Sequence, residues 1–102
     1  MCSVKESDWK LFRKLIPEWQ ERFMARLLGE YSKMIAGQGL ASDRFWNLQK
    51  RLQKDVQKVG VRVEMKRSVM LMNLLSLMQE GAITQDDLDG FSDELRQFLR
   101  GV

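Results

Sequence analysis

Residues 69–78 read V-M-L-M-N-L-L-S-L-M, and only Asn73 and Ser76 interrupt this apolar run. A helix that is apolar on nearly every side is typical of a protein core. The run is too short to be a membrane-spanning helix, which needs about 20 apolar residues. We therefore predict a buried helix over residues 62–80, with the rest of the chain packed around it.

The segment after this helix reads E-G-A-I-T-Q-D-D-L and predicts a tight turn between two helices. Gly81 can adopt the left-handed backbone conformation that closes a helix C-terminus. Thr84 is the expected N-cap of the next helix, with Asp87 in the first turn, where backbone N–H groups lack partners. Ile83 and Leu88 have the spacing of a hydrophobic staple.

An amphipathic pattern over residues 8–36 predicts helix, because steps of three and four separate its apolar positions. These positions are Trp9, Phe12, Leu15, Ile16, Trp19, Phe23, Leu27, Tyr31 and Met34 or Ile35. Pro17 interrupts the pattern. A proline inside a helix costs roughly 3 kcal/mol, whereas at the first helical position it costs almost nothing. We expect a short helix over 8–15 and a long helix that starts at Pro17. A single helix with a kink near Pro17 is the alternative.

Serines are expected to begin the first two helices. Ser7 is the expected N-cap of the first, and Ser3 with Glu6 three residues later forms an alternative capping box. Ser42 is the expected N-cap of the second helix.

The second helix is predicted over residues 43–59 and ends before Gly60. Its apolar stripe consists of Phe45, Leu48, Leu52, Val56 and Val59. The next residues, 61–64, alternate between apolar and charged and resemble a strand. Because the sequence offers no partner strand, we expect a turn that leads into the buried helix.

The last helix is predicted over residues 85–100, although Gly90 lies inside it at a cost of about 1 kcal/mol relative to alanine. Its apolar stripe consists of Leu88, Phe91, Leu95 and Phe98 or Leu99. Gly101 follows its last turn. The predicted fold is all-α: one domain, residues 1–102, that forms a small helical bundle of four main helices.

The composition excludes several kinds of catalytic and metal site. The chain has no histidine and one cysteine, Cys2, which rules out zinc sites built on these residues, histidine-dependent nucleophiles and internal disulfides. Glycine-rich phosphate-binding motifs are absent. Calcium-loop spacing is also absent from the acidic cluster Asp86, Asp87, Asp89, Asp93 and Glu94. We expect a protein that is not an enzyme and that uses no metal or cofactor.

The N-terminal residues M-C-S-V-K-E-S-D-W lack the apolar segment of a signal peptide. No stretch is long and apolar enough to cross a membrane. A single thiol suits a reducing compartment. We therefore expect a cytoplasmic protein that does not associate with membranes.

Charge is unevenly distributed along the chain. Residues 43–78 hold eight basic and three acidic residues, and residues 79–102 hold six acidic and two basic ones. The basic residues of the middle segment form a candidate face for a polyanion or a protein partner: Arg44, Lys50, Arg51, Lys54, Lys58, Arg62, Lys66 and Arg67. The alternative is a solvated face that the acidic last helix partly balances. That helix begins Gln85-Asp86-Asp87, so it should not enter a DNA groove.

A second candidate surface is apolar. If neighbouring helices leave part of the central helix uncovered, the exposed strip would be a dimer or partner interface made by Met70, Leu74, Leu77 and Met78. The seven methionines of the chain are expected mainly to fill gaps in the core, and the three tryptophans are expected to be core residues. Asn73, if buried, needs a hydrogen-bond partner and is expected to have a structural role.

Four segments resemble a family of small, uncharacterised all-helical proteins of Gram-positive gut bacteria. They are E-S-D-W-K-L-F-R-K-L-I-P-E-W-Q-E-R at 6–22, F-W-N-L at 45–48, R-S-V-M at 67–70 and E-G-A-I-T-Q-D-D-L-D-G-F-S-D-E-L at 80–95. Members often carry the label "multidrug transporter", which the absence of a membrane-spanning segment contradicts. The resemblance implies a bacterial, cytoplasmic, helical protein and implies no activity or site residues.

Our first hypothesis is a non-enzymatic interaction or regulatory protein that acts through protein–protein contact with an unknown partner or with itself, as a homodimer. The second is a nucleic-acid-binding accessory protein that uses the basic face. A narrower form of either is an inhibitor, encoded by a phage or mobile element, that binds a host enzyme. An enzyme is the third class, but no carboxylate or lysine pair is convincingly placed for acid–base chemistry.

Overall fold

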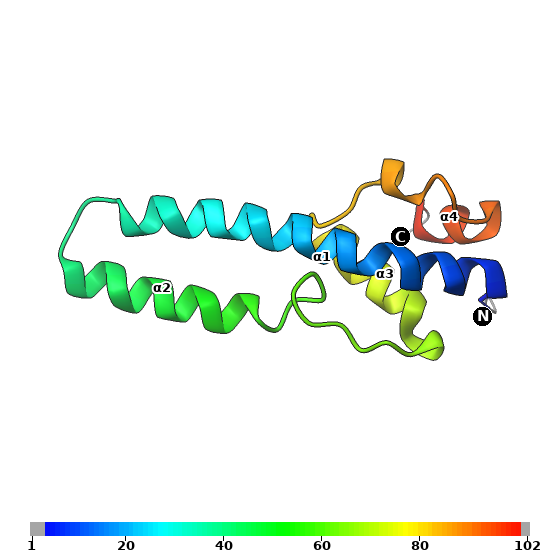
Figure 1. Ribbon diagram of the computed structural model, residues 1–102, viewed down its shortest axis with the longest axis horizontal. Helices are drawn as coiled ribbons and strands as arrows, with labels where there is room; N and C mark the ends of the chain where they lie inside the picture. The colour runs from blue at the N-terminus through cyan, green and yellow to red at the C-terminus, as the bar shows by residue number, and fades with distance from the viewer. Residues whose placement is uncertain (1–3, 101–102) are drawn as a thin grey trace.

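The computed structural model describes residues 4–100, and the predicted all-α fold is confirmed within them. The molecule is elongated, with extents of 51 × 24 × 22 Å (Figure 1). Its elements are α1 (Glu6–Ile35), α2 (Ala41–Asp55), the 3-10 helix η1 (Arg67–Val69), α3 (Met70–Gln79), the 3-10 helix η2 (Gln85–Leu88) and α4 (Asp93–Arg100).

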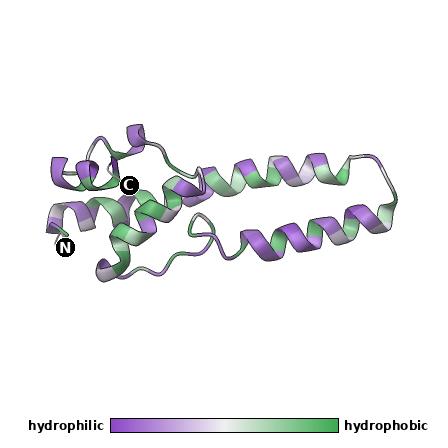
Figure 2. Cartoon of the chain, turned by 180° about the vertical axis from the view of Figure 1, so that it is seen from behind, coloured by the Kyte–Doolittle hydropathy of each residue, from purple (hydrophilic) through white to green (hydrophobic). Residues whose placement is uncertain are grey.

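Helix α1 runs along most of the length of the molecule (Figure 1). Its N-terminal half packs with α3, η2 and α4 into a compact base, whereas most of its C-terminal half projects away from the base and lies alongside α2 (Figure 1). We call the projecting hairpin, residues 24–56, the arm. A view from behind shows apolar residues collected where the base elements meet, and apolar and polar residues intermixed along the arm (Figure 2).

The prediction that Pro17 starts a new helix is wrong, and of the alternative, a single helix with a kink, the single helix is confirmed. The proline deprives the carbonyl of Arg13 of its N–H partner, and both residues lie on the exposed face of α1. Phe12, Ile16 and Trp19 on the opposite face are buried in the base. Their packing on both sides of the proline outweighs a local cost of roughly 3 kcal/mol.

The predicted serine caps are also wrong. Helix α1 begins one residue before Ser7, with Lys5 at the N-cap position and no capping side chain. Helix α2 begins one residue before Ser42, with Leu40 at the N-cap position. The alternative cap, Ser3, lies outside the described residues, as do Cys2 and Gly101.

The central helix is shorter than predicted, because residues 62–66 are irregular and α3 begins only at Met70. Residues 61–64 form no strand, and the predicted turn is present at Val61 and Arg62, after which the chain is irregular up to η1. Asn73 is buried, and its Nδ2 donates to the carbonyl of Glu64 at 3.0 Å. The expected structural role is therefore confirmed, because this side chain fastens the irregular segment to α3.

The turn after α3 has the predicted geometry. Gly81 has φ of +76°, and the backbone N–H of Thr84 donates to Oδ2 of Asp87 at 2.9 Å. Two arginines of α1 hold this turn from the side. Arg22 contacts both carboxylate oxygens of Asp87, at 3.1 and 2.9 Å, and Arg26 donates to the carbonyl of Gly81 at 2.9 Å.

The last predicted helix, 85–100, is wrong as a single element, because it divides into η2 and α4. Gly90 lies at the break, where a Cβ would stand 2.9 Å from a methyl group of Leu11. The buried carboxylate of Asp8 accepts from both the backbone N–H and the hydroxyl of Ser92, at 2.9 and 2.6 Å. Ser92 in turn caps α4 by accepting from the N–H of Leu95. The contact between Asp8 of α1 and Ser92 thus fixes the start of α4 at Asp93.

The apolar core lies along α1 and in the base. Its buried members are Phe12, Ile16, Trp19, Phe23, Leu27, Tyr31, Met70, Leu74, Leu77, Ala82, Ile83, Leu88, Phe91, Leu95 and Leu99. None of them belongs to α2. The stripe predicted for the last helix is confirmed through Leu99 and not Phe98, which is exposed.

Candidate functional site

Helix α2 faces α1 mainly with polar side chains, with Leu48 as the apolar residue among them. Its only buried residue is Asp55, which is 1% exposed, and none of its apolar side chains is fully buried. A helix that docks on a neighbour normally buries its apolar stripe. Of the predicted apolar stripe, Leu48 and Val59 are half-buried against the core, whereas Phe45, Leu52 and Val56 are exposed.

The contact between α1 and α2 is built around the carboxylate of Asp55. Its Oδ2 accepts from the hydroxyl of Tyr31 at 2.5 Å and from Nε of Arg51 at 2.8 Å. Its Oδ1 lies 3.1 Å from Nζ of Lys58. Arg51 also bridges to Glu30 on α1 at 2.8 Å and lies over the ring of Tyr31. A buried carboxylate is costly unless several partners compensate it, and here three do so.

This network shifts two pKa values. Burial opposes ionisation of Asp55, but the hydrogen bonds from Tyr31, Lys58 and Arg51 outweigh it and lower the pKa of Asp55 below its usual range. Burial, together with the hydrogen bond to the Asp55 carboxylate, raises the pKa of Tyr31 to about 12. At neutral pH the pair therefore consists of an un-ionised phenol and an ionised carboxylate, which suits a structural clamp.

A second clamp fixes the root of the arm. The carboxylate of Glu80, at the end of α3, accepts from the backbone N–H groups of Val59 and Gly60 at 2.9 and 3.0 Å. Gly60 is pressed against the ring of Phe23, so that a Cβ there would lie 2.3 Å from a ring carbon. Helix α2 ends at Asp55 and not at residue 59 as predicted, and the chain turns over residues 56–61, where Glu80 supplies acceptors for two backbone N–H groups.

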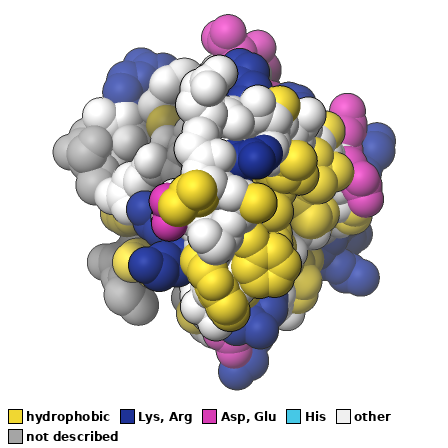
Figure 3. Space-filling model, turned by 90° about the vertical axis from the view of Figure 1, so that its left-hand side faces the viewer, with side chains coloured by type: hydrophobic (Ala, Val, Ile, Leu, Met, Phe, Trp, Pro, Cys, Tyr) yellow, Lys and Arg dark blue, Asp and Glu magenta, His cyan; other side chains and the backbone are white. Residues whose placement is uncertain are grey.

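The apolar side chains of α2 contribute to an exposed surface. Seven of the ten exposed large apolar side chains in the described part of the chain belong to the arm, each 41–69% exposed: Leu28, Ile35, Leu40, Phe45, Trp46, Leu52 and Val56. An end-on view shows hydrophobic side chains gathered over the end of the molecule that the arm forms (Figure 3). Trp46 is thus an exception to the expectation that tryptophans are core residues. Trp19 meets that expectation, and Trp9 is half-buried.

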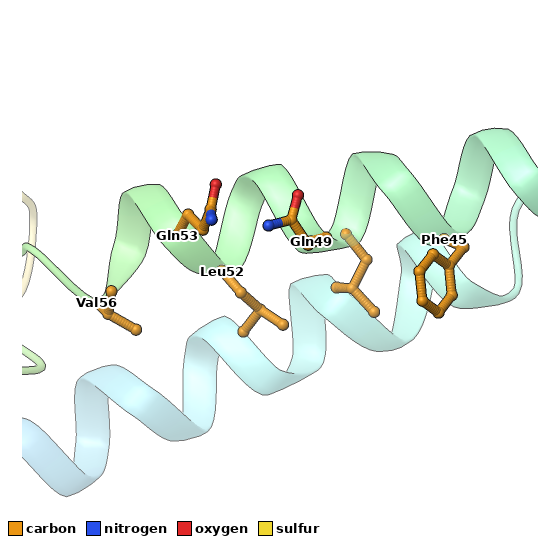
Figure 4. Close-up of a pocket in the computed structure, with 6 residues that line it drawn as sticks. Phe45, Gln49, Leu52, Gln53 and Val56 are labelled. Atoms are coloured by element: carbon orange, nitrogen blue, oxygen red, sulfur yellow. The ribbon is translucent and has the colours of Figure 1, made fainter.

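A groove runs along the seam between α1 and α2. Its middle part has a volume of about 380 Å³ and is lined by Phe45, Leu48, Gln49, Leu52, Gln53 and Val56. In Figure 4, Phe45, Leu52 and Val56 follow one another along the side of α2 that overhangs α1. Two adjoining hollows share lining residues with it and extend it to Ile35 at the tip and to Val61 at the root. The three hollows therefore form one groove along the arm.

The exposed side of this groove carries no charge. At about 100° per residue, the residues of α2 from Leu48 around to Trp46 cover about 160° of the helix without a charged side chain. The adjoining sector of α1, which includes Leu28 and Ile35, is also uncharged. We call this surface the arm face: Met24, Ala25, Leu28, Gly29, Ser32, Ile35, Ala41, Ser42, Phe45, Trp46, Leu48, Gln49, Leu52, Gln53 and Val56.

The predicted basic residues do not form one free cationic face. Six of the eight have partners within the chain, and most partners are acidic residues outside the last helix. Arg51 and Lys58 bind Asp55, Lys66 binds Glu64, and Arg67 binds Glu6. Arg44 donates to the carbonyl of Ile35, and Arg62 donates to Gln57. Among the described residues, no ion pair involves Lys50 or Lys54, which are exposed on α2.

The predicted apolar interface on the central helix is not available. Met70, Leu74 and Leu77 are 0% exposed, and Met78 is half-buried against the core. The only strongly exposed apolar residue of α3 is Met72. The exposed apolar side chains therefore lie mainly on the arm and not on the central helix. The available signal was the charge-free stripe of α2 itself, together with the acid and arginine spaced four residues apart on its other side.

Residues 4–100 contain no group of three or more His, Cys, Asp or Glu positioned to hold a metal ion. The acidic cluster near the C-terminus is engaged in part by cations, since Asp87 pairs with Arg22, Asp93 with Arg96 and Glu94 with Lys5. No helix in this part of the chain is long and apolar enough to cross a membrane.

Comparison of the chain with protein-family models, with curated proteins and with solved structures finds no match. The resemblance to a family of Gram-positive gut bacteria therefore stays an expectation from the sequence, as does its implication of a bacterial, cytoplasmic protein.

Proposed function

We propose that this chain is a non-enzymatic protein-interaction module and that the arm face is its binding surface. The observation that carries the proposal is that α1 leaves much of the apolar stripe of α2 exposed to solvent. Its charged residues Arg51 and Asp55 are used against α1, while Phe45, Leu52 and Val56 are left on the outside. Large exposed apolar patches mark sites of interaction with other proteins.

Burying the apolar side chains of this surface against another protein would be energetically favourable. Fully burying a large apolar side chain is worth roughly 1.5–3 kcal/mol, and seven such side chains of the arm are still substantially exposed. Aromatic residues at the centre of an interface often dominate binding, and Phe45 and Trp46 stack edge to face, with 5.1 Å between ring centroids. The Asp55 network fixes the position of α2 on α1, so the helix that carries these rings is already in place before a partner binds, which lowers the entropic cost of binding.

Binding of nucleic acid through the basic face has less support. A polyanion site needs several cations that are free to contact phosphates. Here the arginines of the segment are engaged with Glu30, Asp55 and Glu6, and with backbone or amide oxygens. Two neighbouring lysines on one helix, Lys50 and Lys54, provide a weak cationic patch at most.

Photo-crosslinking in cells of the source organism tests the proposal. A photoreactive phenylalanine analogue is placed at Phe45, on the arm face, and in a matched variant at Met72, which is equally exposed on α3. We expect a crosslinked adduct of defined mass from position 45 and none from position 72. Adducts from neither position, or equal adducts from both, would overturn the assignment of the arm face.

A further inference from the structure

We propose that the occupant of the arm face is a second copy of this chain. The two arms would pack about a two-fold axis, with their α2 helices antiparallel, and form a four-helix bundle. This inference rests on the proposed function and names the partner for it. In a two-fold interface the same surface serves both subunits, so it must be complementary to itself. The arm face meets this condition because it is uncharged along its length and most of its large side chains are apolar.

The two helices of one arm would make up half of a four-helix bundle. Two helices side by side bury only a narrow strip, and four helices are the common solution in which each helix covers its neighbours. The arm already has a short connection, residues 36–40, and an apolar groove along its seam. A second arm laid across the groove would cover it from tip to root. The groove is apolar at both ends, so the tip of one subunit would meet an apolar root on the other.

The charges at the edge of the arm face favour the antiparallel direction. Asp43, Lys50 and Lys54 lie along one edge of α2, just outside the uncharged sector. An axis that passes between Leu48 and Gln49 would place Asp43 opposite Lys54 of the partner subunit, twice per dimer. A parallel two-fold arrangement would instead put this edge of the two α2 helices on opposite sides of the dimer, so Asp43 and Lys54 of the partner subunit could not pair.

The same axis also pairs apolar residues of the two subunits. It would place Phe45 opposite Leu52 of the partner subunit and Val56 opposite Ala41 of the partner subunit. Each contact combines a larger side chain with a smaller one, as interdigitated helix packing requires. One axis therefore accounts for both the charged edge and the apolar centre.

Sedimentation equilibrium on the full chain tests self-association. We expect a mass twice the 12.0 kDa of the monomer at micromolar concentration. Phe45→Asp should weaken the dimer at least a hundredfold, and the control Met72→Asp should leave it unchanged, with helical circular dichroism retained in both. A chain that stays monomeric near 100 µM, or a dimer insensitive to Phe45→Asp, would overturn the inference.

Charge reversal tests the antiparallel pairing. Asp43→Lys and Lys54→Asp should each weaken the dimer by on the order of tenfold, because each puts like charges opposite each other twice. The double variant should recover most of the loss. A double variant as weak as the sum of its parts would overturn the antiparallel pairing. If the chain is monomeric but position 45 crosslinks to a different protein, the second copy is excluded while the interaction module stands.

Discussion

At the scale of single residues, the arm depends on the pair formed by Tyr31 and Asp55. The structure joins them across 24 positions of sequence by a hydrogen bond of 2.5 Å. The buried carboxylate needs the phenol as a donor, and the phenol is held un-ionised by burial and by the neighbouring negative charge. Neither property belongs to a residue on its own, and both arise from the contact.

Tyr31 is the only tyrosine of the chain, so its ionisation can be followed by tyrosinate absorbance. Because its pKa is raised to about 12, above an unfolded value of about 10, its contribution to stability is complete below about pH 10 and is lost as the pH rises towards 12. We expect tyrosinate to form only near pH 12, or together with alkaline unfolding, and near pH 10 in denaturant. A native-state midpoint near 10 would contradict the buried pair.

At the scale of elements, tertiary contacts decide where helices end. Glu80 accepts hydrogen bonds from two backbone N–H groups after α2, and Asp8 accepts one from the backbone N–H of Ser92 before α4. Each carboxylate belongs to a different helix from the one that it terminates or starts. Local capping rules do not include such partners, and this explains the wrong boundaries predicted for both elements.

Gly60→Ala tests the close contact at the root of the arm. A Cβ there would lie 2.3 Å from the ring of Phe23, which the core holds rigidly, so we expect the free energy of unfolding to fall by about 1–3 kcal/mol in urea denaturation. Gly90→Ala is the matched comparison. Its Cβ would meet only the mobile end of Leu11 at 2.9 Å, and its loss should be smaller. Equal losses would show that steric pressure on Phe23 is not the cause.

At the scale of the whole molecule, the base and the arm differ in how they bury apolar surface. The base encloses α3, whose Leu74 is fully buried, and the arm leaves most of α2 open to solvent. Only the base is a complete core within one chain. The arm therefore offers apolar surface for assembly without exposing the core of the base.

Two aspartate substitutions separate these roles. Leu74→Asp should unfold the protein, because an unpaired carboxylate in a fully buried site costs more than a domain of this size can lose. Phe45→Asp should leave the fold intact, because the side chain is already 64% exposed. Circular dichroism and thermal unfolding measure both. A folded Leu74→Asp variant would contradict the burial of Leu74 in the core of the base.

The sequence by itself determined the all-α class, the burial of Leu74 and Leu77, and the turn from Gly81 to Thr84. These features depend on periodicity and on the backbone preferences of neighbouring residues. Only the tertiary structure decided that α1 passes through Pro17 and that much of the apolar stripe of α2 stays exposed. The physical reason is that packing on both sides of the proline, and the buried Asp55 network, join residues far apart in the chain and together outweigh local preferences of a few kcal/mol.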